Sequence, residues 1–282
     1  MNSEKWIRRL LCAAALVSIA AAFCILLVLI YLVLPLISSG RLGTVLSWQW
    51  LPFQGKFGIL PMVVGSLLLS VGALIIATPL AVGVSCFVQV LAPDRIKGLC
   101  LAVVHYMTSI PTVIYGFVSV FLLVPLMRHW FDRGTGFSLM TAMIVLTLLI
   151  LPTIVLVFQA TLREVDRTAR VTCAALGFSK PPYIRHVLLP LSRRGLMAAV
   201  ILGFGRAVGD TLIALMLAGN APVIPGSPMD SIRSLTAHIG LVVATDSQST
   251  FYHSVFASGL ILFVIMILIN LALRKLGSSL TP

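Results

Sequence analysis

Charged residues are scarce in this chain, and acidic ones are the scarcest: of 282 residues, 10% are charged and only eight are Asp or Glu. A soluble globular domain carries roughly a quarter of its residues as charges. This shortage, together with 59% hydrophobic residues and a mean hydropathy of +1.09, excludes an ordinary soluble domain. The composition predicts an all-α integral membrane protein in which several apolar helices pack as one unit.

The chain also lacks the patterns of a disulfide framework, a metal centre or a catalytic site. Its five cysteines are scattered without a CxxC pair and its histidines are isolated, so neither a disulfide nor a metal site is expected. No Gly-rich GxxxxGK[ST] loop occurs, which excludes ATP binding by the usual loop. No Ser/His/Asp or Cys/His arrangement stands out, so no catalytic residue is assigned.

Six apolar runs are long enough to cross a bilayer, which takes about 20 apolar residues in a helix. Helices are expected because every backbone group in hydrocarbon must be bonded internally. After a cytoplasmic tail of residues 1–9, the transmembrane domain covers 10–282. Its predicted helices are 10–37, 59–91, 100–127, 138–162, 195–219 and 252–273. The prolines inside them predict kinks or local breaks, at Pro79, Pro111, Pro125 and Pro152.

Basic residues are distributed unequally over the two sides of this six-helix arrangement. Fourteen of the 20 Lys and Arg residues fall on one side, five fall on the other, and Arg206 alone lies inside a predicted span. The positive-inside rule therefore predicts that both termini are cytoplasmic. Membrane lipid is the expected surrounding, and the net charge of +12 needs no nucleic acid as a partner.

Two connections between the predicted helices are too long for simple turns. The outer one, 220–251, starts with turn residues and continues through an apolar stretch too short to span, so a re-entrant or interfacial helix is expected. The inner one, 163–194, has a helical pattern that Gly177 is expected to close in the left-handed conformation after Leu176. Ser179 then offers an N-cap for a second short helix, which predicts a helix–turn–helix elbow.

Apolar side chains are frequent in this cytoplasmic elbow, and two interpretations stay open. The segment is either a basic loop that only satisfies the topology, because inside loops collect positive charge, or a docking surface for a partner. The apolar side chains that favour docking are Ala174, Ala175, Leu176, Phe178, Tyr183 and Ile184.

Part of the elbow resembles a known cytoplasmic signature. Gly177, followed by Val187 and then by Leu189-Pro190, is similar to the loop of bacterial ABC-importer permeases that reads Glu-Ala-Ala, Gly, Ile-x-Leu-Pro. The resemblance implies a coupling helix seated in a groove of an ATPase subunit, with ATP and Mg bound by that subunit and no cofactor on this chain. Where the family has Glu-Ala-Ala, residues 171–173 read Val-Thr-Cys.

Five further segments are similar to permeases of phosphate-specific transport systems, of the PstC type. They are FGILPMVVG (57–65), SIPTVIYGF (109–117), GRAVGDT (205–211), AGN (218–220) and SLTAHI (234–239). The resemblance implies a type I ABC-importer permease fold, a place in the bacterial inner membrane and transport of inorganic phosphate. It also implies a second related permease, two ATPase subunits and an external phosphate-binding protein as partners.

Arg206 is unusual because a charge at the centre of a membrane helix costs about 2.5–3.5 kcal/mol even on lenient scales. Asp210 follows four residues later, which would put both side chains on one helical face, where they can pair. In a structural interpretation, the two form a self-neutralising ion pair. In a functional one, Arg206 lines the path of an oxyanion, which its forked donors match, and Asp210 limits the affinity.

Four neutral residues complete the predicted path. Thr211 and Asn220 are expected to add contacts beyond the charged pair. Ser109 and Thr112 flank a proline in the third span, where hydroxyl groups either restore the missing backbone hydrogen bond or line a cavity.

The cargo and the class of protein each leave alternatives. Molybdate, tungstate and sulfate are alternatives to phosphate, because arginine binds any tetrahedral oxyanion. An intramembrane enzyme or a structural scaffold is an alternative from another class. The elbow, and the absence of catalytic polar clusters in the spans, argue against that last alternative.

Overall fold

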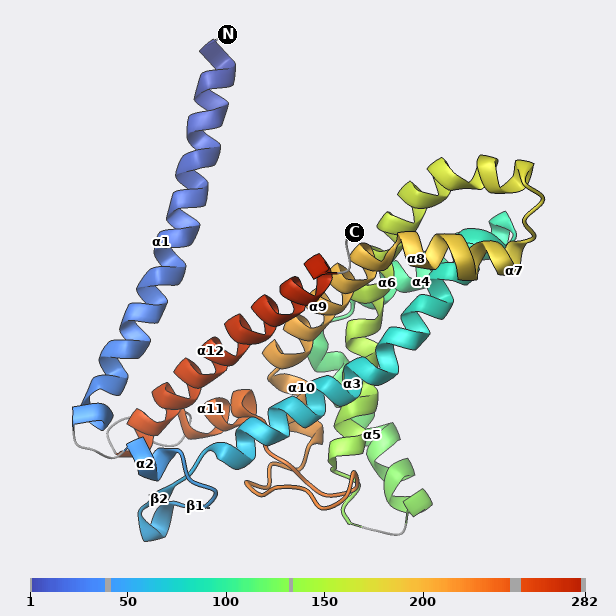
Figure 1. Cartoon of the computed structure of the whole chain (residues 1–282). Helices are drawn as coiled ribbons and strands as arrows, with labels where there is room; N and C mark the ends of the chain where they lie inside the picture. Colours follow the sequence, from blue (N-terminus) through green and yellow to red (C-terminus); the bar gives the residue numbers. More distant parts are fainter. Residues whose placement is uncertain (1, 39–41, 132–133, 244–249, 280–282) are drawn as a thin grey trace.

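The computed structural model describes residues 2–38, 42–131, 134–243 and 250–279, and helices dominate it (Figure 1). Four helical segments in these residues are long and apolar enough to cross a membrane. They are α1 (Asn2–Ser38), α3 (Leu60–Cys86) with its π-helical continuation η2 (Phe87–Leu91), α5 (Thr112–Phe131) and α6 (Leu139–Ala175). Residues 180–191 and α9 (Arg193–Gly209) together can form a fifth. A count of six unbroken spans is therefore not confirmed.

The core is centred on α6, which packs against both α3 and α9. On α3, Ala73, Ala77 and Ala81 recur every four residues and are fully buried. Their small side chains allow the helix backbones to approach closely, as is usual between membrane helices. The hydroxyl of Thr147 on α6 donates a hydrogen bond across this contact to the Ala73 carbonyl, at 3.2 Å. The main core is thus built by long-range packing of small and branched side chains.

Two of the predicted spans, 100–127 and 195–219, are each broken into two helices. The four pieces are α4 (Asp94–Ser109) and α5 in the first, and α9 and α10 (Leu212–Leu217) in the second. At the first break Ile110 is extended, with φ −75° and ψ 123°. Pro111 explains this conformation, because a proline disfavours the helical region for the residue before it. At the second break Asp210 is also extended, with φ −76° and ψ 120°. The other three prolines at which a kink or break was expected, Pro79, Pro125 and Pro152, lie inside continuous helices.

The helix α1 stands apart from the other helices over much of its length (Figure 1). It packs against α12 (Thr250–Ser279), and Val33 of α1 joins a small second core with Val45, Ile59 and Ala257. The short elements at this outer end are α2 (Leu42–Val45), β1 (Trp50–Leu51), η1 (Pro52–Gln54), β2 (Lys56–Phe57) and α11 (Leu235–Val243). The two strands pair antiparallel, with Trp50 opposite Phe57. The helix α11 lies in the outer connection, where a short helix was expected.

The elbow is a helical hairpin that leaves the main body at the end of α6 (Figure 1). Its second arm joins α7 (Lys180–Tyr183), the π-helical η3 (Ile184–Leu188) and α8 (Leu189–Leu191), and a bend of 68° leads into α9. Gly177 has φ +76°, and its N–H donates to Ala174 O at 3.0 Å while that of Phe178 donates to Cys173 O at 3.0 Å. These two bonds define a Schellman motif, so the predicted stop at Gly177 is confirmed. Ser179 occupies the N-cap position, but its side chain makes no capping bond.

Candidate functional site

Arg206 lies in the last turn of α9, beside the break that separates this helix from α10. Its side chain is half-buried, and Nη1 donates a hydrogen bond of 2.8 Å to the hydroxyl of Thr153 on α6. A cation is favourable at this end of a helix, where carbonyl groups lack intrahelical partners. Within the described residues, the ion pair that forms lies in the elbow and joins Arg170 to Asp166. The guanidinium of Arg206 is therefore held by a neutral partner, with donors left for another group.

The expected ion pair between Arg206 and Asp210 is wrong in its geometry. Because α9 ends at Gly209, a spacing of four residues no longer places both side chains on one helical face. Asp210 Oδ1 instead accepts a 2.8 Å hydrogen bond from the N–H of Ile213, which caps the start of α10. Asp210 still interacts electrostatically with Arg206 without forming an ion pair.

The break between α4 and α5 lies beside the break between α9 and α10. Met216 of α10 sits so close to Gly116 of α5 that a Cβ at position 116 would clash with its sulfur. Both residues are in the second turn of their helices, so the two helix starts lie at the same level. Tyr115 joins the breaks, since its hydroxyl donates to Met107 O at 3.0 Å and its side chain interacts electrostatically with Arg206.

Three of the predicted neutral path residues lie at these breaks. Ser109 ends α4 and is exposed, although its hydroxyl donates to the His105 carbonyl at 3.3 Å. Thr112 begins α5 and Thr211 precedes α10, and both are half-buried. The structure thus brings together polar residues from two segments about 100 positions apart, around the end of α9.

Asn220 belongs to a different place, beyond the far end of α10. It is left-handed, with φ 57°, and its amide donates to Leu215 O at 2.7 Å, so it closes the end of this helix. The backbone carbonyl of Asn220 accepts a 2.9 Å hydrogen bond from Nε of Arg233, in the outer connection. Asn220 and Arg233 therefore order the outer connection and are separated from the breaks by the length of α10.

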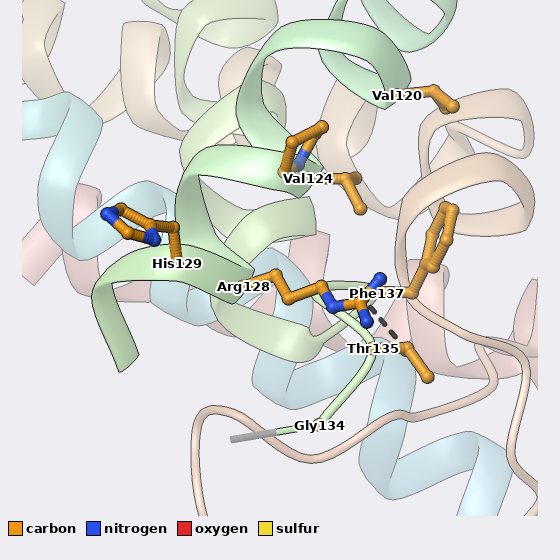
Figure 2. A pocket seen from close by; sticks show the side chains of 8 residues that line it. Val120, Val124, Arg128, His129, Gly134, Thr135 and Phe137 are labelled. Carbon is orange, nitrogen blue, oxygen red and sulfur yellow. Dashed lines mark hydrogen bonds between the residues drawn. The ribbon is translucent and has the colours of Figure 1, made fainter. Parts of the chain in front are cut away.

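A pocket of about 520 Å³ opens at the outer end of α5 (Figure 2). It is lined by Arg128 and His129 from the last turn of α5 and by Thr135 and Phe137 from the connection to α6. The backbone N–H of Phe137 donates to the Thr135 hydroxyl at 3.4 Å, which shapes one wall. Arg128 is exposed, in contrast to the half-buried Arg206. The predicted path residues lie elsewhere.

The elbow divides into an exposed tip and an inward-facing arm. At the tip, Ala174 and Gly177 are exposed, and Leu176 and Phe178 keep 71% and 42% of their surface exposed. The half-buried residues of the arm are Ile184, Val187, Leu189 and Pro190. The first three of these pack against the main core. The tip therefore offers Leu176 and Phe178 to a partner, while the three packed residues of the arm are turned toward the core.

Tyr183 was expected on the docking surface, and this is wrong. Only 5% of its surface is exposed, and its hydroxyl donates a 2.8 Å hydrogen bond to Oδ1 of Asp166 on α6. Burial, reinforced by this bond, raises the pKa of Tyr183 well above its ordinary value. The phenol thus stays a neutral donor at any physiological pH.

Several residues of these sites were missed from the sequence. Thr153, Asp166, Gln89 and Gln159 all make buried or half-buried side-chain bonds. The signal available was the presence of two glutamines in or beside apolar runs, because polar residues in membrane helices usually find partners in the protein interior. Their partners lie 70 or more residues away in the chain, which no local pattern shows.

The chain matches the family described as binding-protein-dependent transport system inner membrane component, over residues 79–281. It is 35% identical to the probable ABC transporter permease protein YqgH of Bacillus subtilis over 236 residues, which cover 83% of this chain and 76% of that protein. It is 30% identical to the phosphate transport system permease protein PstC of Pasteurella multocida over 225 residues, which cover 71% and 70%. The PstC protein of Haemophilus influenzae is also 30% identical, with 68% of each chain covered.

The fold is similar to that of a solved transporter. A structure of the MetNI methionine ABC transporter in an inward-facing conformation superposes with a TM-score of 0.66 and covers 83% of this chain and 100% of that chain. The sequence identity is 18%, so this likeness concerns the fold alone.

Proposed function

Because this chain belongs to the family of binding-protein-dependent transport system inner membrane components, we propose that it is the permease subunit through which an ATP-driven importer moves inorganic phosphate inward. Relatives with about 30% identity are named as phosphate transport permeases. The chain is a multi-pass protein of the inner membrane and a permease subunit rather than an enzyme.

The observation that carries the proposal is the state of Arg206. Its guanidinium is half-buried at two adjacent helix breaks, is held by the neutral Thr153, and forms no ion pair with a described carboxylate. A cation in a membrane interior requires a counter-charge or a wet cavity. A passing oxyanion supplies that charge, and the fork of the guanidinium matches two of its oxygens.

The hydroxyl groups at the breaks support the same assignment. Ser109, Thr112 and Thr211 place neutral donors near the start of α5 and of α10 without adding charge. Neutral contacts bind weakly enough for release, which transport requires at every site along a path. Asp210 interacts electrostatically with Arg206, which lowers the net positive potential there and so also favours release.

The proposal extends to the partners. A second related permease would complete the path, an external binding protein would deliver phosphate, and two ATPase subunits carrying ATP and Mg would dock at the elbow tip. The exposed Leu176 and Phe178 beside the Gly177 turn supply the apolar contact. Both termini would be cytoplasmic, on the elbow side.

The decisive experiment measures which anion drives the complete importer. The complex is reconstituted in liposomes with its binding protein, and ATP hydrolysis and uptake are followed with phosphate, sulfate, molybdate and tungstate. We expect phosphate to stimulate both. Stimulation by another of these anions would reassign the cargo and keep the permease assignment, whereas stimulation by none would contradict both.

The docking assignment has a separate test. Phe178→Asp and Leu176→Asp each place a charge on the apolar tip, so the ATPase subunit should no longer co-purify while the permease stays in the membrane. Val223→Asp is the matched control, since Val223 is also an exposed apolar residue, at 54%, but lies in the outer connection. Full recovery of the ATPase with either tip variant would contradict docking at this place.

The orientation is tested by cysteine labelling in a cysteine-free background. Ser179 in the elbow and Val223 in the outer connection are both exposed. A cysteine at position 223 should react with an impermeant reagent added outside, and one at position 179 should react only after permeabilisation. Ser192, although also on the elbow side, is fully buried and would report poorly.

A further inference from the structure

A chain of buried polar side chains connects the elbow to two transmembrane helices. Tyr183 donates to Oδ1 of Asp166 at 2.8 Å, and Gln89 donates through Nε2 to Oδ2 of the same carboxylate at 3.0 Å. Gln159 in turn donates through Nε2 to Oε1 of Gln89 at 2.7 Å. All four residues are at most 9% exposed. Three separate segments, the elbow arm, α6 and η2, thus meet at one carboxylate.

The direction of this hydrogen-bond chain is set by Asp166. A carboxylate only accepts hydrogen bonds, so Gln89 must turn its NH₂ group toward it. The carbonyl oxygen of Gln89 then faces Gln159, which must donate in its turn. As a consequence, a buried acceptor, Oε1 of Gln159, has no hydrogen-bond partner among the described residues, which is unfavourable in free energy. The hydrogen bonds that Tyr183 and Gln89 donate to the Asp166 carboxylate are strong because the acceptor is charged, and they offset this unfavourable contribution.

The surroundings of the carboxylate favour a fixed position. Arg170 approaches Oδ2 of Asp166 to 3.5 Å, but its side chain is 58% exposed, so the ion pair adds little. The buried bonds from Tyr183 and Gln89 therefore hold the carboxylate. Gln89 lies inside the π-helical turn η2, and Tyr183 directly precedes the π-helical turn η3. Such turns are frequent at functional sites of helices.

We propose that Asp166 is the positioning residue of the elbow, and that its carboxylate couples movement of the elbow to α6 and to the end of α3. The assignment rests on the proposed function of the elbow as the ATPase contact. It goes beyond that function, because the elbow tip makes the contact and Asp166, behind it, determines whether a displacement of the tip reaches the spans. A chain of buried polar groups suits this task, since its members move together or lose their bonds.

The experiment compares variants in the reconstituted importer at equal ATPase occupancy. Wild type is first titrated with phosphate, sulfate, molybdate and tungstate, and the stimulating anion is used for all variants, so a wrong cargo does not affect the comparison. The readout is the ratio of stimulated to basal ATP hydrolysis. Asp166→Leu, which leaves Tyr183 and Gln89 without an acceptor, should lower this ratio about tenfold, and Tyr183→Phe about threefold, because bonds to charged groups are involved.

Asp166→Asn is the informative conservative variant. The side-chain oxygen of the new asparagine can still accept from Tyr183, and its NH₂ group can donate to Oε1 of Gln89 once the Gln89 amide flips. The NH₂ group of Gln89 then faces Gln159, whose amide must flip as well so that its Oε1 accepts. The chain reverses and every bond is kept, so the ratio should return to within about twofold of wild type. Glu164→Leu is the matched control, an exposed acid on the same helix, and should leave the ratio unchanged.

Three results would overturn the proposal. One is a wild-type ratio in both Asp166→Leu and Tyr183→Phe. Another is an Asp166→Asn variant as defective as Asp166→Leu, which would mean that charge rather than the bonded chain matters. The third is a ratio as low in the control Glu164→Leu as in Asp166→Leu, which would mean that the loss of any acid from this part of α6 disturbs coupling. Because Tyr183→Phe removes a single hydroxyl, it still decides the question if Asp166→Leu fails to assemble.

Discussion

The two broken helices have nearly the same backbone conformation at the break, but different groups cause the break in each. Ile110 and Asp210 are extended with φ and ψ values within a few degrees of each other. At the first break, Pro111 imposes the conformation through its ring. At the second, the carboxylate of Asp210 caps α10 through a single hydrogen bond to Ile213. One break is fixed by the covalent structure. The other is held by hydrogen bonds that can open, namely this cap and a 3.1 Å bond from the Thr236 hydroxyl to the Asp210 carbonyl.

This difference assigns different roles to the two breaks. The proline break offers an exposed serine and a half-buried threonine and carries no charge of its own. The capped break carries Arg206 in the preceding turn, and the same Asp210 both caps the next helix and influences the arginine. If Arg206 binds an anion as proposed, the anion would therefore act on the geometry of the second break, whereas the geometry of the first break would stay constant.

The largest expected effect follows from removing the charge at the second break. Arg206→Met should reduce phosphate uptake by at least about a hundredfold, since two charge-assisted hydrogen bonds to the anion are lost. Arg128→Met, which removes the exposed arginine of the outer pocket, is the matched control and should retain most of the uptake. Uptake of labelled phosphate, normalised to membrane abundance, measures both.

Two companion variants sharpen this first prediction. Arg206→Lys should recover little uptake, because a point charge lacks the fork that matches two oxygens. The double variant Arg206→Met/Asp210→Leu should remain inactive. If the double variant transported phosphate at a near-normal rate, both residues would be architectural and the path would lie elsewhere.

The next effect concerns Asp210 itself, where two substitutions separate capping from charge. Asp210→Ala removes the cap and should lower stability by about 0.5–2 kcal/mol, seen as a lower melting temperature of the purified protein. Asp210→Asn keeps the cap, since asparagine caps as well as aspartate, and should slow turnover by leaving Arg206 more attractive to the anion. Equal melting temperatures for the two variants would show that the cap does not matter.

Releasing the proline break should have a smaller effect. Pro111→Ala permits Ile110 to become helical, so α4 and α5 can join into one straighter helix. Uptake should fall roughly threefold without loss of membrane protein, because the start of α5 with Thr112 shifts relative to the second break while the helix itself gains a hydrogen bond. Spin labels on α4 and α5 would report the straightening directly, and an unchanged distance would contradict it.

The smallest effect is expected for the tyrosine that joins the two breaks. Tyr115→Phe loses one neutral hydrogen bond to the Met107 carbonyl, which is worth about 1 kcal/mol. Uptake should change by less than about threefold, and the phenylalanine should still pack beside Arg206. A loss as large as that of Arg206→Met would mean that the phenol, rather than the arginine, binds the anion.

Local signals in the sequence predicted local structure well. The stop at Gly177 was predicted because a left-handed residue closes a helix by this motif. Kinks or breaks were predicted at four prolines, and a break is found at Pro111, while Pro79, Pro125 and Pro152 lie inside continuous helices. The second break was missed although Asp210 followed by Thr211 is an acceptable helix start signal. The assumption of one continuous helix over 195–219 then produced an ion pair that the structure does not have.

Contacts between distant segments could not be predicted from any local pattern. Arg206 bonds to a threonine 53 residues away, and Gln89 bonds to a carboxylate 77 residues away. Tyr183 was assigned to the surface because its neighbours suggested a docking face, yet Asp166 draws it inward. Where a helix faces depends on packing in three dimensions, which a single sequence does not encode in its spacing.

The π-helical turns η2, at the end of α3, and η3, in the elbow arm, share one mechanical property. Each such turn holds one residue more than an α-helical turn would. If a turn relaxed to α-helix, the segment beyond it would advance by about 1.5 Å and rotate by about 100°, because these are the rise and the angle of one residue. Gln89 lies in η2 and Tyr183 directly precedes η3, and both side chains bond to Asp166. The two π-helical turns, each with one extra residue, therefore lie on either side of one carboxylate. Each of the two segments therefore has one residue by which it would lengthen if its π-helical turn became α-helical.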